Sequence, residues 1–111
     1  MNFDEYQQLA YKTAGHGPDK QTDIFVSLLG LAGESGEVLD YMKKVYVHGH
    51  KLDEDKLKKE LGDTIWYLSD LCSRFGFSLD EVAQLNIKKL KSRYPEGFSA
   101  QKSQNRKPED V

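Results

Sequence analysis

Four carboxylates form two pairs with identical spacing in the first two-thirds of the sequence. Glu34 and Glu37 lie three residues apart in the stretch GLAGESGEV. Glu60 and Asp63 repeat that spacing in KKELGDTIW. Side chains three residues apart share one flank of a helix, so each pair presents its carboxylates to one side. Four acids in one cleft repel unless a cation neutralises them or some stay protonated. The all-oxygen set predicts a site for a hard ion, Mg²⁺ with Mn²⁺ as the alternative.

A single pair of acids at this spacing is also common on a solvated helix face that binds nothing. Recurrence on two consecutive helices, each time with glycine and apolar neighbours, favours a site. Gly30 and Gly33 each lie one turn before a glutamate on the same flank. Glycine inside a helix costs about 1 kcal/mol relative to alanine. We therefore expect these glycines to leave a groove for a neighbouring helix or a ligand.

The elements that must position these acids are helices. Apolar residues recur at helical spacing over most of the chain, and strand signals are nearly absent. We expect one helix near residues 2–13, a second near 22–46, a third capped by Asp53 and ended by Gly76, and a fourth opened by Ser78. The predicted fold class is all-α, a four-to-five-helix antiparallel bundle in which the second and third helices pair. Residues 1–98 form the predicted domain and residues 99–111 a polar tail.

So thin a bundle leaves helix faces poorly covered in a single copy, and we expect a homodimer or homotetramer. The main apolar face of the fourth helix carries Leu79, Ala83, Ile87 and Leu90. Val82 and Leu85 point away from that face, which makes them interface candidates together with Trp66. We expect a second chain to complete each site.

The length, composition and charge of the chain limit the classes of protein to which it can belong. A length of 111 residues suits one domain, and the single cysteine, Cys72, excludes an internal disulfide. A net charge of -2 argues against a dedicated binder of nucleic-acid polymers. No apolar run reaches the roughly 20 residues of a membrane span, and the polar start MNFDEYQQLAYK does not look like a secretory signal. We expect a cytoplasmic protein without a membrane partner.

Three stretches, GLAGESGEVLDYMKK, KKELGDTIWYLSDLC and NIKKLKSRYPEGF, resemble the MazG-like family of all-α nucleoside triphosphate pyrophosphohydrolases. The family pattern is E-x-x-E, a variable gap and E-x-x-D. Here 22 residues separate Glu37 from Glu60, and the resemblance spans about residues 2–106. One position departs from the pattern, because many members carry a glutamate where this chain has Gly33.

The resemblance implies that four residues hold Mg²⁺: Glu34, Glu37, Glu60 and Asp63. It also implies hydrolysis of an NTP or dNTP to the NMP and pyrophosphate by water attack at the α-phosphorus, as in house-cleaning of the nucleotide pool. In such chemistry metal ions offset phosphate charge and acidify a bound water. We assign Glu37 to orienting or deprotonating the attacking water, with Glu34 as the other catalytic candidate.

Substrate-binding candidates lie on the fourth helix and beside the acids. Asn86, Lys89 and Arg93 share one helix face, where they can bind phosphates or sugar. Spacing alone favours a solvated basic face, but the presence of Asn86 on the same face and the match to the family's N-x-x-K-x-x-x-R pattern favour substrate binding. Tyr67 lies one turn beyond Asp63, where we predict stacking on a base or donation to phosphate, with core packing as the alternative.

Three other classes of function remain as alternatives, and the sequence disfavours the first of them. A dinuclear iron bundle would need Glu-x-x-His motifs, and Glu37 and Asp63 occupy the positions where histidines are required. A helical interaction protein with solvated acids is a second alternative. A non-catalytic module that binds nucleotide or metal is a third.

Overall fold

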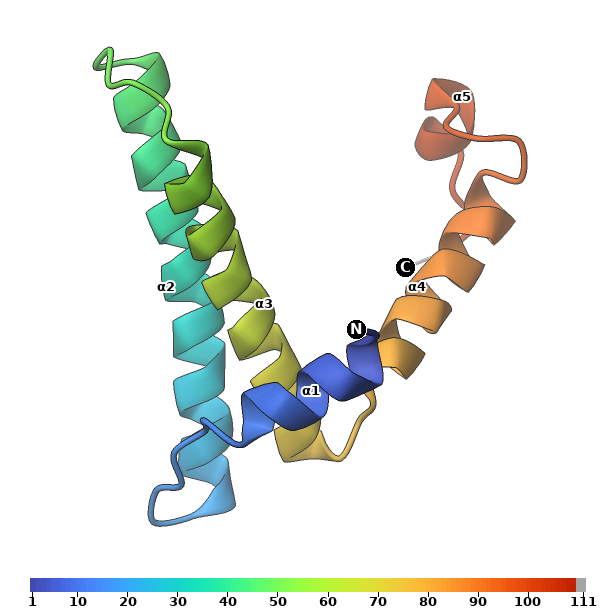
Figure 1. Ribbon diagram of the computed structural model, residues 1–111. Coiled ribbons are helices and arrows are strands. Elements are labelled where there is room, and N and C mark those ends of the chain that lie inside the picture. Colours follow the sequence, from blue (N-terminus) through green and yellow to red (C-terminus); the bar gives the residue numbers. More distant parts are fainter. Residues whose placement is uncertain (110–111) are drawn as a thin grey trace.

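The computed structural model describes residues 1–109, so residues 110–111 of the predicted tail lie outside the described part. Five helices follow one another along the chain (Figure 1): α1 (Phe3–Tyr11), α2 (Lys20–Tyr46), α3 (Glu54–Phe75), α4 (Leu79–Arg93) and α5 (Ala100–Gln104). Within these residues the chain forms no β-strand, and the predicted all-α class is confirmed. The short helix α5 was not predicted and lies within the segment that the sequence indicated only as a polar tail.

Side-chain caps begin the helices close to where the sequence predicted. Asn2, Asp53 and Ser78 each accept a hydrogen bond from the backbone N–H three residues later. Such a cap typically stabilises a helix by about 1 kcal/mol. Asp19 caps α2 in the same way, so this helix begins two residues earlier than predicted. Gly76 ends α3 with a φ of 74°, a left-handed conformation that glycine adopts without strain.

Helices α2 and α3 form a long antiparallel hairpin, as predicted for the two acid-bearing helices (Figure 1). At its loop end, the Tyr41 hydroxyl accepts a hydrogen bond from the backbone N–H of Asp53 at 2.8 Å. At its other end, the fully buried Ser27 hydroxyl donates to Asp70 at 2.6 Å. Hydrogen bonds between the two helices at both ends therefore hold the acid-bearing turns against each other.

A buried ionic network, which the sequence analysis missed, joins the α1–α2 loop to this hairpin. The Arg74 side chain is 7% exposed, with Nε 3.4 Å from Asp70 and Nη1 3.5 Å from Asp23. Its guanidinium also donates to the carbonyl of Gly15 and contacts Nδ1 of His16 at 2.9 Å. Because a buried charge is costly without partners, these contacts fix the loop in place.

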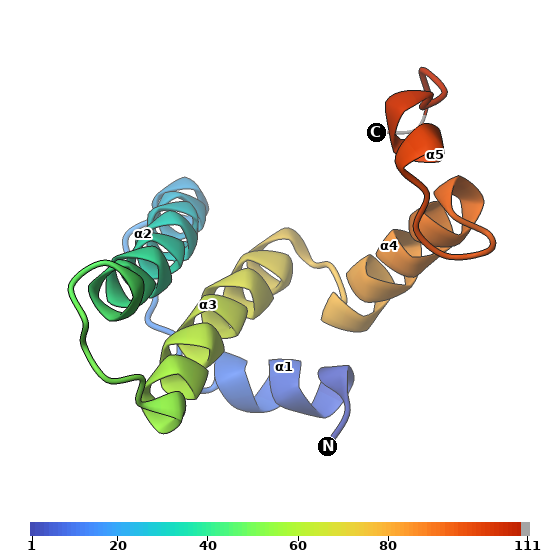
Figure 2. The ribbon, with the colours of Figure 1, turned by 90° about the horizontal axis from the view of Figure 1, so that it is seen from above.

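Helix α4 leaves the hairpin instead of packing along it. Figures 1 and 2 both show α4 pointing away from α2 and α3, and its contacts are with α1 and α3. Its main apolar face is buried at Leu79, which is 4% exposed, whereas Ile87 is 50% exposed. Leu85, an interface candidate, is 60% exposed. Most of α4 therefore adds nothing to the core of a single chain.

The single chain exposes more surface than a compact protein of its mass. Its accessible surface is 8472 Å², against about 6,200 Å² expected for 12.7 kDa. Its radius of gyration is 17.2 Å, against about 13 Å expected for this length. The excess of about 2,200 Å² per chain matches what each partner buries in an obligate dimer. Across residues 1–109, no helix has both the length and the apolarity to cross a membrane.

Candidate functional site

Three of the four predicted acids converge between the facing helices. One carboxylate oxygen from each of Glu34, Glu60 and Asp63 lies within 4.8 Å of the other two. Glu34 comes from α2, and the other two come from adjacent turns of α3. Glu34 and Glu60 are half-buried, whereas Asp63 is exposed and leaves the cluster open to solvent. The antiparallel pairing of α2 and α3 thus brings together three of the four acids that the sequence analysis placed in one site.

Glu37, the fourth predicted ligand, lies outside this three-acid cluster. Its side chain is exposed, about 4.5 Å further along the axis of α2 than Glu34. Glu37 is therefore not one of the three acids that converge most closely, and its part as a metal ligand stays a prediction. Its charge still acts on Glu34, as the pKa of that residue shows.

The electrostatics of the cluster centre on Glu34. Partial desolvation raises the pKa of its carboxyl group above the ordinary value, and the charges of Asp63, Glu37 and Glu60 raise it further. A site that penalises a bare carboxylate in this way favours a proton or a cation. Oxygens around Mg²⁺ at 2.0–2.1 Å lie about 3–4 Å apart, so small side-chain rotations bring the three carboxylates to that spacing. The residues present fit such an ion.

Glycine plays a different part at each of the two predicted groove positions. A Cβ atom on Gly30 would overlap ring atoms of Tyr67, which packs against the α2 backbone there. The Tyr67 ring also meets Trp66 edge-to-face, with centroids 5.0 Å apart. A Cβ on Gly33 would meet nothing within 4 Å, so the surface before Glu34 is open. Packing of the helices accounts for Tyr67 here, and its contact with substrate stays a prediction.

Comparison with known proteins now assigns the chain to a family. Residues 26–98 match the model of the MazG nucleotide pyrophosphohydrolase domain, which covers 73 of the 111 residues and both acid pairs. The chain belongs to the MazG nucleotide pyrophosphohydrolase family. It is also 32% identical over 114 residues to the Gene 37 protein of Mycobacterium phage L5, a match that covers 96% of this chain and 100% of that protein. No solved structure matches this MazG chain.

The basic residues predicted to bind substrate lie away from the acids of the same MazG chain. Helix α4 carries Asn86, Lys89 and Arg93, and it diverges from the α2–α3 hairpin in both views (Figures 1 and 2). Lys89 and Arg93 line an open hollow of about 700 Å³ beside α5, and Asn86 is not among its described lining residues. One chain therefore does not bring these cations onto its own three-acid cluster.

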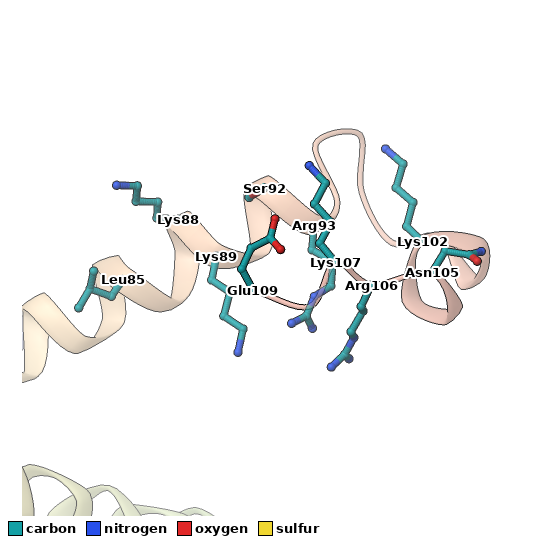
Figure 3. A pocket seen from close by; sticks show the side chains of 10 residues that line it. All are labelled: Leu85, Lys88, Lys89, Ser92, Arg93, Lys102, Asn105, Arg106, Lys107 and Glu109. Carbon is teal, nitrogen blue, oxygen red and sulfur yellow. The ribbon is translucent and has the colours of Figure 1, made fainter. Parts of the chain in front are cut away.

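Sequence reasoning missed the cations that the C-terminal segment adds to this hollow. Lys102 and Arg106 line it together with the α4 residues (Figure 3). One signal was present, because Ser99 stands where an N-cap belongs and caps the first turn of α5. The charge of a polar tail does not indicate which face of α4 the tail will contact. The hollow could therefore not be predicted from the sequence alone.

Proposed function

We propose that this MazG protein is an Mg²⁺-dependent nucleotide pyrophosphohydrolase. It would hydrolyse an NTP or dNTP to the NMP and pyrophosphate by water attack at the α-phosphorus. The observation that carries the proposal is the convergence of Glu34, Glu60 and Asp63 from facing helices in a member of this family. An all-carboxylate cluster open to solvent suits a hard ion that also contacts phosphate oxygens.

Each acid takes a role that follows from its position. Glu34, Glu60 and Asp63 would hold the divalent ion, with Mn²⁺ as the alternative to Mg²⁺. When bound, the ion supplies positive charge that offsets the charge of the phosphate chain. Glu37 is exposed one turn from Glu34 and outside the cluster, so its carboxylate is available to orient the attacking water and accept its proton.

The proposal includes assembly, with α4 of one copy serving the acids of another. Residues 1–84 carry nine Lys or Arg and fifteen Asp or Glu, whereas residues 85–107 carry seven Lys or Arg and one Glu. This separation of charge favours contact between the basic residues 85–107 of one chain and the more acidic residues 1–84 of a second, which include the three-acid cluster. A homodimer or homotetramer would also cover the apolar surface that a single chain exposes.

A nucleotide panel tests the enzymatic proposal. The wild-type protein is incubated with Mg²⁺ and common, deoxy and damaged nucleoside triphosphates, and both pyrophosphate and orthophosphate are measured. We expect pyrophosphate release that stops in EDTA and is lost in Glu34→Gln. Asp40→Asn is the matched control, because Asp40 is an exposed acid of α2 that pairs with Lys43 and Lys44. Absence of turnover across the whole panel would contradict the enzyme.

A binding module without catalysis is the second candidate function. The separation of Lys89 and Arg93 from the acids within one chain favours it, because the chain alone lacks a complete set of phosphate-binding and metal-binding groups in one place. Calorimetry with nucleotide and Mg²⁺, followed by product analysis, distinguishes the two. Heat of binding without products indicates a sensor, and no heat at all indicates a helical interaction protein.

A further inference from the structure

The hollow between α4 and the C-terminal segment concentrates positive charge. Ten of the described residues line its volume of about 700 Å³ (Figure 3), and six of these are cationic: Lys88, Lys89, Arg93, Lys102, Arg106 and Lys107. Glu109 is the single acid among these lining residues. The lysines of the hollow form no ion pair with another described residue, unlike Lys43 and Lys44, which pair with Asp40.

We propose that this hollow binds the polyphosphate group of a nucleotide and that Arg106 joins Lys89 and Arg93 in holding it. The inference deepens the proposed function and rests on it for the identity of the ligand. Figure 3 shows these three side chains pointing to one side of the hollow, with Lys88 and Lys102 pointing to the other. Two arginines and a lysine on one side match the several charged oxygens of a polyphosphate.

The fold after α4 brings Arg106 to this position. Helix α4 ends at Arg93, and a turn closed by the Gly97 N–H donating to the Tyr94 carbonyl reverses the chain. Helix α5, capped by Ser99, lies beyond the end of α4, and the segment after α5 brings Arg106 back toward α4 (Figure 3). The pKa of the Tyr94 hydroxyl is lowered, first by a hydrogen bond with Ser103 and then by Arg93 and Arg106. Both guanidinium groups thus act on the same phenol, which agrees with their place in one site.

A small polyphosphate fits the hollow better than a nucleic-acid strand. A volume of about 700 Å³ lies in the range of small-ligand sites. Surfaces for single strands present aromatic side chains on which bases stack, and none of the ten lining residues is aromatic. Glu109 lies beside α4 within the hollow and adds one negative charge to it (Figure 3).

Calorimetric titration of the full chain with inorganic tripolyphosphate, in EDTA and at low salt, tests the site. We expect saturable binding by the wild type and roughly tenfold weaker binding by Arg106→Gln. Glu109→Gln should bind more tightly, because it removes a negative charge from the lining of the hollow. Lys91→Gln is the matched control, since Lys91 is a cation of α4 that does not line this hollow. It should bind like the wild type.

Three results would overturn the proposal: no binding by the wild type, equal binding by Arg106→Gln, or an equal loss in Lys91→Gln. Length-dependent binding of a single-stranded oligonucleotide, tighter than that of tripolyphosphate, would assign the hollow to nucleic acid and also overturn it. Thermal unfolding of Arg106→Gln excludes a folding defect, because this exposed side chain should leave Tm unchanged. Because EDTA removes divalent ions, this titration measures binding at the hollow independently of the proposed metal-dependent reaction. If tripolyphosphate binds but no nucleotide is hydrolysed, only the proposed enzyme activity is contradicted. If nucleotide is hydrolysed but tripolyphosphate does not bind, only the proposed role of the hollow is contradicted.

Discussion

At the scale of single residues, Glu34 links charge, stability and metal binding. Its folded-state pKa is raised by desolvation and by Asp63, Glu37 and Glu60, so the folded chain holds this proton to higher pH than the unfolded chain. Without metal, stability therefore falls as pH rises from the ordinary glutamate value through the raised pKa. We expect Glu34→Gln to raise the Tm of the metal-free protein at neutral pH and to reduce the Tm increase on adding Mg²⁺.

Asp40 provides a control, because its pKa is shifted in the opposite direction to that of Glu34. Hydrogen bonds and charge from Lys43 and Lys44 lower its pKa, so its contribution to stability is present above the ordinary value and is lost as pH falls. Asp40→Asn should therefore lower Tm slightly at neutral pH and leave the response to Mg²⁺ intact. Thermal scans from pH 4 to 8 (roughly the window of carboxyl titration), with EDTA or Mg²⁺, make the comparison. A lower Tm for metal-free Glu34→Gln would contradict this electrostatic account.

The two glycines of α2 should respond to alanine in opposite directions. Gly30→Ala places a Cβ into the Tyr67 ring, and overpacking of this kind costs about 1–3 kcal/mol, partly offset by better helix propensity. Gly33→Ala enters open space and should stabilise α2 by about 0.5–1 kcal/mol. Urea unfolding measures both changes. Equal effects of the two substitutions would mean that Tyr67 does not hold α2 and α3 at this distance.

At the scale of elements, Arg74 holds the loop before α2 on the hairpin. Arg74→Leu leaves Asp70 buried without its cation, and breaking a buried pair in this way costs about 3 kcal/mol. Lys43→Leu is the control, because its pair with Asp40 is about half exposed and is worth less than about 1 kcal/mol. Free energies of unfolding from urea titration give both values. A loss for Arg74→Leu no larger than for Lys43→Leu would show that the network is dispensable.

At the scale of the whole molecule, the proposed assembly predicts that copies of the chain associate and that a second copy completes each site. Light scattering should give a mass at least twice the 12.7 kDa of one chain. Glu34→Gln and Arg93→Gln, each inactive alone, should recover activity when unfolded together and refolded as a mixture. A dimer whose sites combine one hairpin with the partner's α4 regains about a quarter of wild-type activity, since half of the dimers hold one intact site.

This mixing experiment separates the two ways of building the site. If acids and cations came from the same chain, every mixed dimer would hold one defect in each site and activity would stay absent. Mixing Glu34→Gln with Glu60→Gln is the control, because both defects lie in one cluster and should not complement. A monomeric mass for the active protein would also contradict assembly.

The local features of this protein were predictable because their causes lie within a few residues of chain. Asn2, Asp53 and Ser78 cap helices through hydrogen bonds that span three residues, and Gly76 ends α3 through its own backbone freedom. The two acid pairs, together with the stretch NIKKLKSRYPEGF, likewise indicated the family. Such features need no knowledge of how distant segments meet.

Only the tertiary structure decided which of these groups meet. The offset between α2 and α3 brings Glu34 onto Glu60 and Asp63 but leaves Glu37 outside, and motif spacing does not specify that offset. The direction of α4 and the return of Arg106 beside it depend on a turn and on contacts with other elements. Sequence periodicity determines the face of a helix on which a side chain lies, whereas packing between helices determines what that face meets.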